Sequence, residues 1–66
     1  APDAIVLHSA AEPQVDDEGR LLTLAGYPVE RRVAAFSWVR REFRCVEVVE
    51  YHPGYYYAVL DRRSPD

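Results

Sequence analysis

The pair Pro53-Gly54 lies between two runs of β-branched and aromatic residues, and it constrains the fold more than any other feature. Proline and glycine suit the two central positions of a type II turn. The runs on either side, Cys45–Tyr51 and Tyr55–Leu60, have the composition of strands. We therefore expect an antiparallel hairpin, in which aromatic side chains pair across the strands. A shift in the apolar alternation at Val48-Val49 predicts either a bulge in the first strand or a strand that is buried on both sides.

The segment that follows Pro28 fits more than one secondary structure. With a period of two, the side chains over 33–39 alternate between faces, and Arg40-Arg41 forms a reversal between two strands. With a helical period, the apolar residues over 29–46 form one stripe, and Pro28 suits the first turn of a helix. A split interpretation places a helix over 29–41 and a strand from residue 43. We favour the hairpin and keep the helix as the alternative.

The flanking sequence supports a single small domain over residues 1–66. Short apolar runs predict strands at Ala4–His8 and Arg20–Ala25. Residues 9–19 are predicted to form a polar loop, and residues 61–66 a polar tail that frays. The predicted fold class is mainly β, as a small antiparallel meander or an SH3-like half-open barrel. The alternative is an α+β fold with a helix at about 29–43 packed on a small sheet.

The core of such a sheet must come from the few large apolar residues. A domain of 66 residues buries only about 60% of the surface of its unfolded chain, so its stability is marginal. We predict that these residues form the core: Phe36, Trp38, Phe43, Val46, Val48, Tyr57 and Val59.

No cofactor or metal is expected to stabilise the domain. The single Cys45 cannot form an internal disulfide, and with His8 and His52 it falls short of the usual four zinc ligands. Inside an apolar strand, Cys45 is expected to behave as a small hydrophobic residue. The core itself or self-association must therefore stabilise the fold, which raises the expectation of an oligomer.

Charge is distributed unevenly along the chain. The formal net charge is −3, residues 1–19 carry five acidic residues and no arginine, and residues 20–44 carry six arginines against two glutamates. A basic middle between acidic ends indicates either a binding face or an acidic arm that neutralises a basic strand of its own fold.

One group of residues stands out as a candidate site. It combines Trp38 with Arg40, Arg41 and Arg44, and places Tyr55 opposite them. Tryptophan, tyrosine and arginine dominate the binding energy of protein interfaces. The same residue types stack on unpaired bases and neutralise phosphates. By contrast, no nucleophile and base are suitably placed for catalysis, because Ser9 and the adjacent His8 would point to opposite faces of a strand.

The pattern Phe36-x-Trp38-x-x-Arg41-x-Phe43-x-x-Val46-x-x-Val49 resembles a small domain of actinobacteria and related high-GC bacteria. That domain carries a Phe-x-Trp-x-Gly-Arg-x-Tyr-x-Val-x-x-Val core, and Arg40 stands where it has glycine. A similar piece occurs in the tail of Y-family-polymerase-like proteins of mutagenesis cassettes. The resemblance implies a β-rich accessory domain without catalysis, linked to DNA repair through protein contacts.

These observations predict a non-catalytic interaction module that binds a protein partner or itself, through a sheet edge and the Trp/Tyr/Arg face. The alternative is a nucleic-acid-binding accessory domain that uses Arg40, Arg41 and Arg44. We expect no small-molecule substrate, because no acid/base pair or pocket-forming length is evident. The apolar run Ala4–Leu7 is too short to span a membrane, and the unpaired cysteine favours the cytoplasm.

Overall fold

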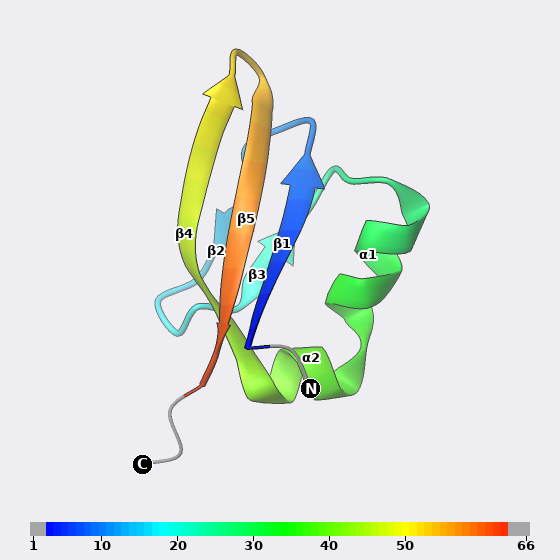
Figure 1. Ribbon diagram of the computed structural model, residues 1–66, viewed down its shortest axis with the longest axis vertical. Coiled ribbons are helices and arrows are strands. Elements are labelled where there is room, and N and C mark those ends of the chain that lie inside the picture. The colour runs from blue at the N-terminus through cyan, green and yellow to red at the C-terminus, as the bar shows by residue number, and fades with distance from the viewer. Residues whose placement is uncertain (1–2, 64–66) are drawn as a thin grey trace.

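The computed structural model describes residues 3–63 and contains a main sheet of three antiparallel strands (Figure 1). The strands are β1 (Ala4–Ser9), β4 (Phe43–His52) and β5 (Tyr55–Arg62), and they lie in the order β1-β5-β4. β5 therefore occupies the centre of the sheet, while β1 and β4 form its two edges. The prediction of a mainly β domain with small antiparallel sheets is confirmed.

The hairpin of β4 and β5 forms around the predicted turn. Gly54 has a φ of 83°, the positive value that a type II turn requires after its proline. The pairing register shifts between Cys45 and Glu47, which leaves Val46 as an extra residue in β4. The bulge therefore lies at Val46 and not at Val48-Val49. A second shift lies beside the turn, between Glu50 and His52.

Two short helices precede β4, namely α1 (Pro28–Ala35) and α2 (Ser37–Glu42). Pro28 begins α1 and forces Tyr27 into an extended conformation, with φ −66° and ψ 159°. Phe36, at φ −59° and ψ 135°, interrupts the helical path. The interpretation of 33–39 as a strand with a reversal at Arg40-Arg41 is therefore wrong. The split interpretation is correct for the strand from residue 43, but its single helix over 29–41 is two helices separated at Phe36.

A second, two-stranded sheet is formed by β2 (Gln14–Val15) and β3 (Leu21–Thr23), and it lies behind the main sheet in Figure 1. The predicted loop over 9–19 thus contains a short strand, and it begins after Ser9, which belongs to β1. Likewise, β5 extends to Arg62, so the tail predicted from residue 61 begins later. Residues 64–66 of that tail lie outside the described residues.

The turn between β2 and β3 is organised by Asp16. Its Oδ1 accepts hydrogen bonds from the backbone N–H of Glu18 at 2.9 Å and of Arg20 at 2.8 Å. The Arg20 side chain donates to Oδ2 at 2.7 Å. The backbone and side-chain hydrogen bonds from Arg20 hold the pKa of Asp16 below its usual value. Stability from these contacts is therefore present above the ordinary carboxyl range and is lost as pH falls through the lowered pKa.

One face of the main sheet carries the core. Its buried residues come from the sheet and from α2: Leu7, Val39, Phe43, Cys45, Ala58 and Leu60. Side chains of β2, β3 and α1 pack against this cluster and cover that face. The opposite face is open, and it carries the cross-strand pairs Val6–Val59 and Val49–Tyr57.

The predicted core is correct in part. Phe43 is 2% exposed and Val48 packs against the buried cluster. Phe36, Trp38 and Val46 are 42%, 38% and 46% exposed, so their assignment to the core is wrong. Phe36 lies between the two helices and Trp38 in α2, both partly in contact with solvent. Val46 is the bulged residue of β4. The other two predicted residues, Tyr57 and Val59, are partly buried on the open face.

Candidate functional site

The predicted site residues lie at opposite ends of the molecule. Trp38, Arg40 and Arg41 belong to α2, whereas Tyr55 follows the turn at the tip of the hairpin (Figure 1). The ten residues of β4 separate the two groups. At about 3.3 Å per residue, that strand spans about 30 Å. A single face that combines tryptophan, tyrosine and arginine therefore does not form, and this part of the prediction is wrong.

The three arginines of the predicted cluster also diverge. Arg40 lines a groove between β3 and the helices, and Arg41 forms an ion pair with Glu42 at 3.6 Å. Arg44 lies on β4, beside a hollow that is lined by the acidic residues 16–18. Asp16 and Glu18 form ion pairs with Arg20, so within the described residues this acidic segment pairs with Arg20 and not with Arg44.

Trp38 connects the core to the surface. Its ring stacks on Phe36 with a centroid distance of 6.2 Å, and it meets the buried Phe43 edge to face at 6.0 Å. Most of its contact area is thus used within the fold, and only part of the ring can meet a partner.

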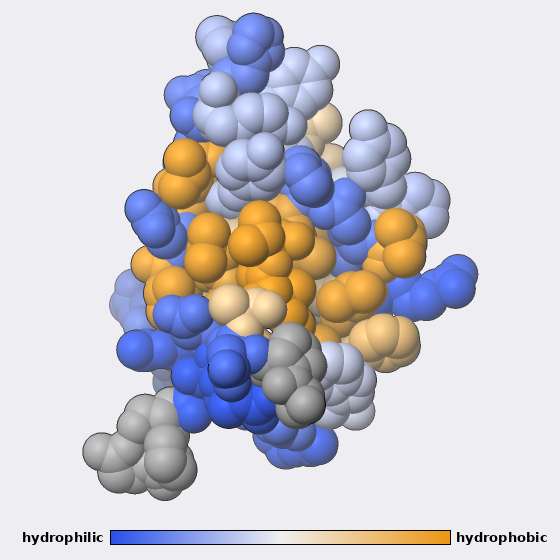
Figure 2. Space-filling view, in the orientation of Figure 1, coloured by the Kyte–Doolittle hydropathy of each residue, from blue (hydrophilic) through white to orange (hydrophobic). Residues whose placement is uncertain are grey.

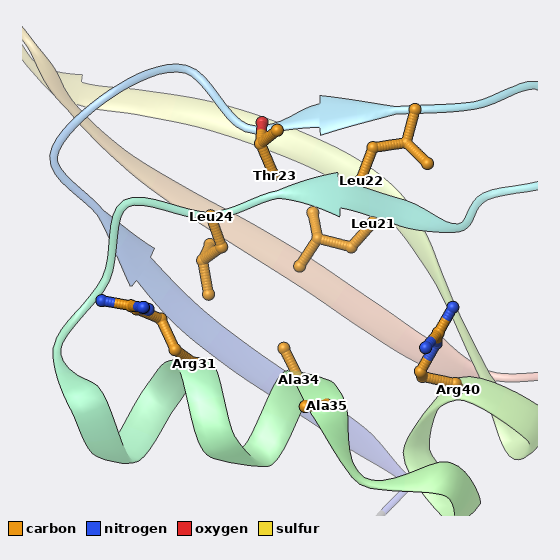
Figure 3. Close-up of a pocket in the computed structure, with 8 residues that line it drawn as sticks. All are labelled: Leu21, Leu22, Thr23, Leu24, Arg31, Ala34, Ala35 and Arg40. Atoms are coloured by element: carbon orange, nitrogen blue, oxygen red, sulfur yellow. The ribbon is translucent and has the colours of Figure 1, made fainter.

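The groove beside Arg40 has a volume of about 330 Å³. Figure 3 shows that Leu21 of β3, Leu24 just after it and Ala34 of α1 point into it, while Arg31 and Arg40 lie toward its two ends. Neither arginine forms an ion pair with another residue of the range 3–63. The groove therefore combines an apolar floor with two cationic ends.

The two edges of the main sheet differ. On β1, the backbone N–H of His8 donates to the carboxylate of Glu30, and the N–H of Ala10 donates to the Ala25 carbonyl at 2.9 Å. On β4, the N–H of Cys45 donates to the Gly19 carbonyl at 2.7 Å. No further backbone bond to the outer side of β4 occurs within the described part of the chain. The stretch from Val46 to His52 is therefore an open edge.

The direction of the backbone groups on this edge follows from the register. Because Cys45 donates outward, its pair with Leu60 is a non-hydrogen-bonded pair, and such pairs alternate along an antiparallel ladder. Val48, opposite Ala58, therefore also points its N–H outward. The outward N–H of His8 on β1 fits the same alternation.

A patch of valines lies on the open face next to this edge. We define the valine patch as Val6, Val46, Val49 and Val59. Val6 is 53% exposed and Val46 is 46% exposed. Figure 2 shows this face, with hydrophobic residues gathered over the middle of the sheet and more polar residues toward both ends. The patch and the open edge of β4 together form one continuous surface.

A second hollow, of about 370 Å³, lies at the hairpin end of the main sheet. A pocket was not expected in a chain this short. The residues that line it are His8, Ser9, Ala10, Ala25, Gly26, Tyr27, Tyr51 and Tyr55. Of these, only Tyr55 was predicted as a site residue. The others could not be found from sequence, because they come from three separated segments without a shared motif.

The structure does not assemble a catalytic group from His8 and Ser9. The Ser9 hydroxyl donates to the Ala11 carbonyl at 2.6 Å and accepts from the N–H of Ala25 at 3.0 Å. It thus serves to hold the chain at the end of β1. Burial raises the pKa of the Cys45 thiol, as expected for a small hydrophobic residue in the core.

Comparison with known proteins identifies no relative: no family model, curated protein or solved structure matches this chain. The resemblance of residues 36–49 to the high-GC bacterial domain therefore stays a prediction. Within residues 3–63, no cluster of three or more metal-binding side chains is present. Over the same described stretch, neither helix is long and apolar enough to cross a membrane.

Proposed function

We propose that this domain is a non-catalytic interaction module that pairs with a second copy of itself through the outer edge of β4. The observation that carries this proposal is the contrast between the two sheet edges. At the C-terminal end of β1, the outward backbone N–H groups bond to Glu30 and Ala25. The outer edge of β4 has no such bonds from Val46 to His52. Open edges are sites at which another strand adds to a sheet.

The size of the chain favours such pairing. A domain of 66 residues has little core, and joining two sheets covers backbone groups and apolar surface that one copy leaves exposed. The valine patch reaches this edge at Val46 and Val49, so pairing through β4 would bring these residues of the two copies close together. A second copy supplies an identical edge, which gives a closed symmetric interface.

The side chains of β4 allow an antiparallel pairing of two copies centred on Val48. In that register, each Glu47 lies opposite Val49 of the second copy, and each Glu50 lies opposite Val46. In this register no two carboxylates lie directly opposite one another. Directly opposed carboxylates would repel and destabilise the pair. The outward N–H of each Val48 would donate to the Val48 carbonyl of the other copy.

Val48→Pro is expected to weaken dimer formation at least about tenfold, because a symmetric interface loses two backbone hydrogen bonds of about 1 kcal/mol each. Since the Val48 N–H points away from β5, the substitution leaves the pairing of β4 with β5 in place. Sedimentation equilibrium over a range of protein concentrations measures the change in the dissociation constant.

The matched control is Ala4→Pro. Ala4 also lies on an edge strand and is exposed, and the outward N–H of His8 indicates that the N–H of Ala4 points outward too. This variant should dimerise as the unmodified protein does. A strict monomer at high concentration, or equal weakening by both substitutions, would show that β4 is not the interface.

Nucleic-acid binding is a second candidate function, favoured by the arginines of the helices. Arg31, Arg32 and Arg40 form no ion pair with other described residues. If they contact phosphates, single-stranded DNA should bind with an affinity that falls as salt rises. Fluorescence anisotropy with a labelled oligonucleotide tests this, with Arg40→Glu/Arg41→Glu as the weakened variant. A flat titration at low salt, or equal affinity of this variant, excludes the candidate.

The link to DNA repair rests on the resemblance of residues 36–49 to the tail domain of polymerase-like proteins. We propose the cytoplasm as the location because Cys45 is an unpaired thiol, which is typical of reducing compartments. In the cytoplasm, dimer formation by this module would hold two copies of the protein together.

A further inference from the structure

The hollow at the hairpin end of the sheet is built where three segments meet. Gly26 approaches β1 so closely that a Cβ atom there would lie 2.8 Å from the His8 carbonyl oxygen. This approach places Tyr27 beside the end of β1, where the Ser9 hydroxyl anchors the N–H of Ala25. The β4–β5 hairpin contributes the other wall. We call this hollow the tyrosine cleft, after Tyr27, Tyr51 and Tyr55.

Two of the three rings of the cleft make aromatic contacts, and all three remain open to solvent. Tyr51 stacks on Tyr57 at a centroid distance of 4.1 Å and lies 6.3 Å from Tyr55. The exposed fractions of Tyr27, Tyr51 and Tyr55 are 71%, 46% and 49%. Three partly exposed rings that line one hollow form an aromatic surface that a ligand can contact.

A carboxylate lies beside the cleft. Glu30, in the first turn of α1, accepts hydrogen bonds from the His8 backbone N–H and from its Nδ1, the latter at 3.0 Å. Its side chain is only 15% exposed. The start of α1 adds about half a positive charge, which the full negative charge of Glu30 outweighs. Glu30 therefore supplies a negative charge beside the cleft.

The hydroxyl groups of the cleft lie within electrostatic range of one another. Burial raises the pKa of Tyr51, and the nearby Tyr57, Tyr27, Tyr55 and Glu30 raise it further. The Tyr51 phenol therefore stays neutral at physiological pH, and its ring remains part of the binding surface. A neutral aromatic face attracts a cation through its quadrupole.

We propose that the tyrosine cleft binds an N-methylated ammonium cation. Three tyrosine rings supply the faces that recognise such a group, and the Glu30 carboxylate supplies the compensating charge. A quaternary ammonium group is apolar on its surface and has no N–H to satisfy, so it suits a cleft whose walls are rings and small side chains. The volume of about 370 Å³ accommodates a trimethylammonium group. The group can come from a free cation such as choline or from a methylated lysine of another protein.

The first test compares choline with 3,3-dimethylbutan-1-ol, its neutral isostere, by NMR titration of the ¹⁵N-labelled domain. Choline is expected to shift the backbone amides of Gly26 and Ala10, which line the cleft. The neutral alcohol should bind roughly tenfold more weakly, because it lacks the charge that the ring faces attract. Equal shifts from both compounds, or no shift at these amides, would overturn the proposal.

Two variants locate the binding. Tyr27→Leu removes one ring face from a largely exposed position, and Glu30→Gln removes the charge while keeping a side-chain oxygen that can accept the His8 N–H. Each is expected to weaken choline binding at least about threefold. Phe36→Leu, which removes an exposed aromatic ring far from the cleft, is the control and should bind normally. Normal binding by both cleft variants would contradict the assignment.

A peptide that contains trimethyllysine, compared with the same peptide containing unmodified lysine, distinguishes the two sources. Tighter binding of the methylated peptide than of choline identifies a protein side chain as the ligand. Binding of choline alone identifies a free cation. Failure of all three probes would exclude this site without bearing on dimer formation through β4.

Discussion

Phe43→Ala is expected to leave the domain largely unfolded at 25 °C. Phe43 is 2% exposed, begins β4, and contacts both Trp38 and the guanidinium of Arg62, which lies 5.1 Å from its ring centroid. Truncation of a buried phenylalanine costs about 3–5 kcal/mol. A domain of 66 residues has a total stability of about 3–10 kcal/mol, so this loss removes much or all of it.

Urea unfolding followed by the fluorescence of Trp38 measures this effect, because Trp38 is the only tryptophan and lies 6.0 Å from the Phe43 ring. Phe36→Ala is the matched control, since Phe36 is the one other phenylalanine and is 42% exposed. That substitution should cost about 1 kcal/mol or less. Similar losses in both variants would mean that Phe43 is not the centre of the core.

Gly19→Ala is expected to destabilise the domain by about 2–4 kcal/mol. Gly19 has a φ of 82°, which costs an alanine about 1–2 kcal/mol. In addition, a Cβ atom there would lie 2.9 Å from the Cβ of Arg44 and 3.2 Å from the Cys45 carbonyl oxygen. Both contacts belong to the backbone region of β4, so the strand or the turn must move. The movement would strain the 2.7 Å hydrogen bond between the Cys45 N–H and the Gly19 carbonyl.

Gly54→Ala separates the cost of the positive φ from the cost of the steric contact with β4. Gly54 has a similar φ of 83°, but nothing lies within 4 Å of its added Cβ atom. Its substitution should therefore cost only the conformational term of about 1–2 kcal/mol. Thermal unfolding by circular dichroism measures both variants. If Gly54→Ala proves as damaging as Gly19→Ala, the contact with Arg44 is not the reason for glycine at position 19.

The hairpin could be predicted from the sequence because its signals are local. Pro53-Gly54 defines the turn, and the residue types on both sides favour strands. The segment after Pro28 could not be decided in the same way, because Val33 and Val39 fit both a helical and an alternating pattern. The helices form there because they place Val39 against Phe43 and Leu60 in the core, a contact that depends on the whole fold.

The candidate surfaces were harder to predict for a related reason. Trp38 and Tyr55 were grouped by residue type, yet the length of β4 places them at opposite ends. Conversely, Tyr27 and Tyr51 line one cleft although α1, α2 and most of β4 separate them in sequence. The contact of Glu30 with His8, which joins α1 to β1, spans 22 residues and leaves no local signal.

The order of the strands has a consequence for how the protein is made. β5 pairs with both β1 and β4, and these two strands do not pair with each other. During synthesis, β1 and β4 emerge from the ribosome first and have no neighbour until Tyr55–Arg62 follows them. The nascent chain therefore holds two unpaired strands until its central strand arrives, and the sheet then forms by pairing residues as far apart as Ala4 and Asp61.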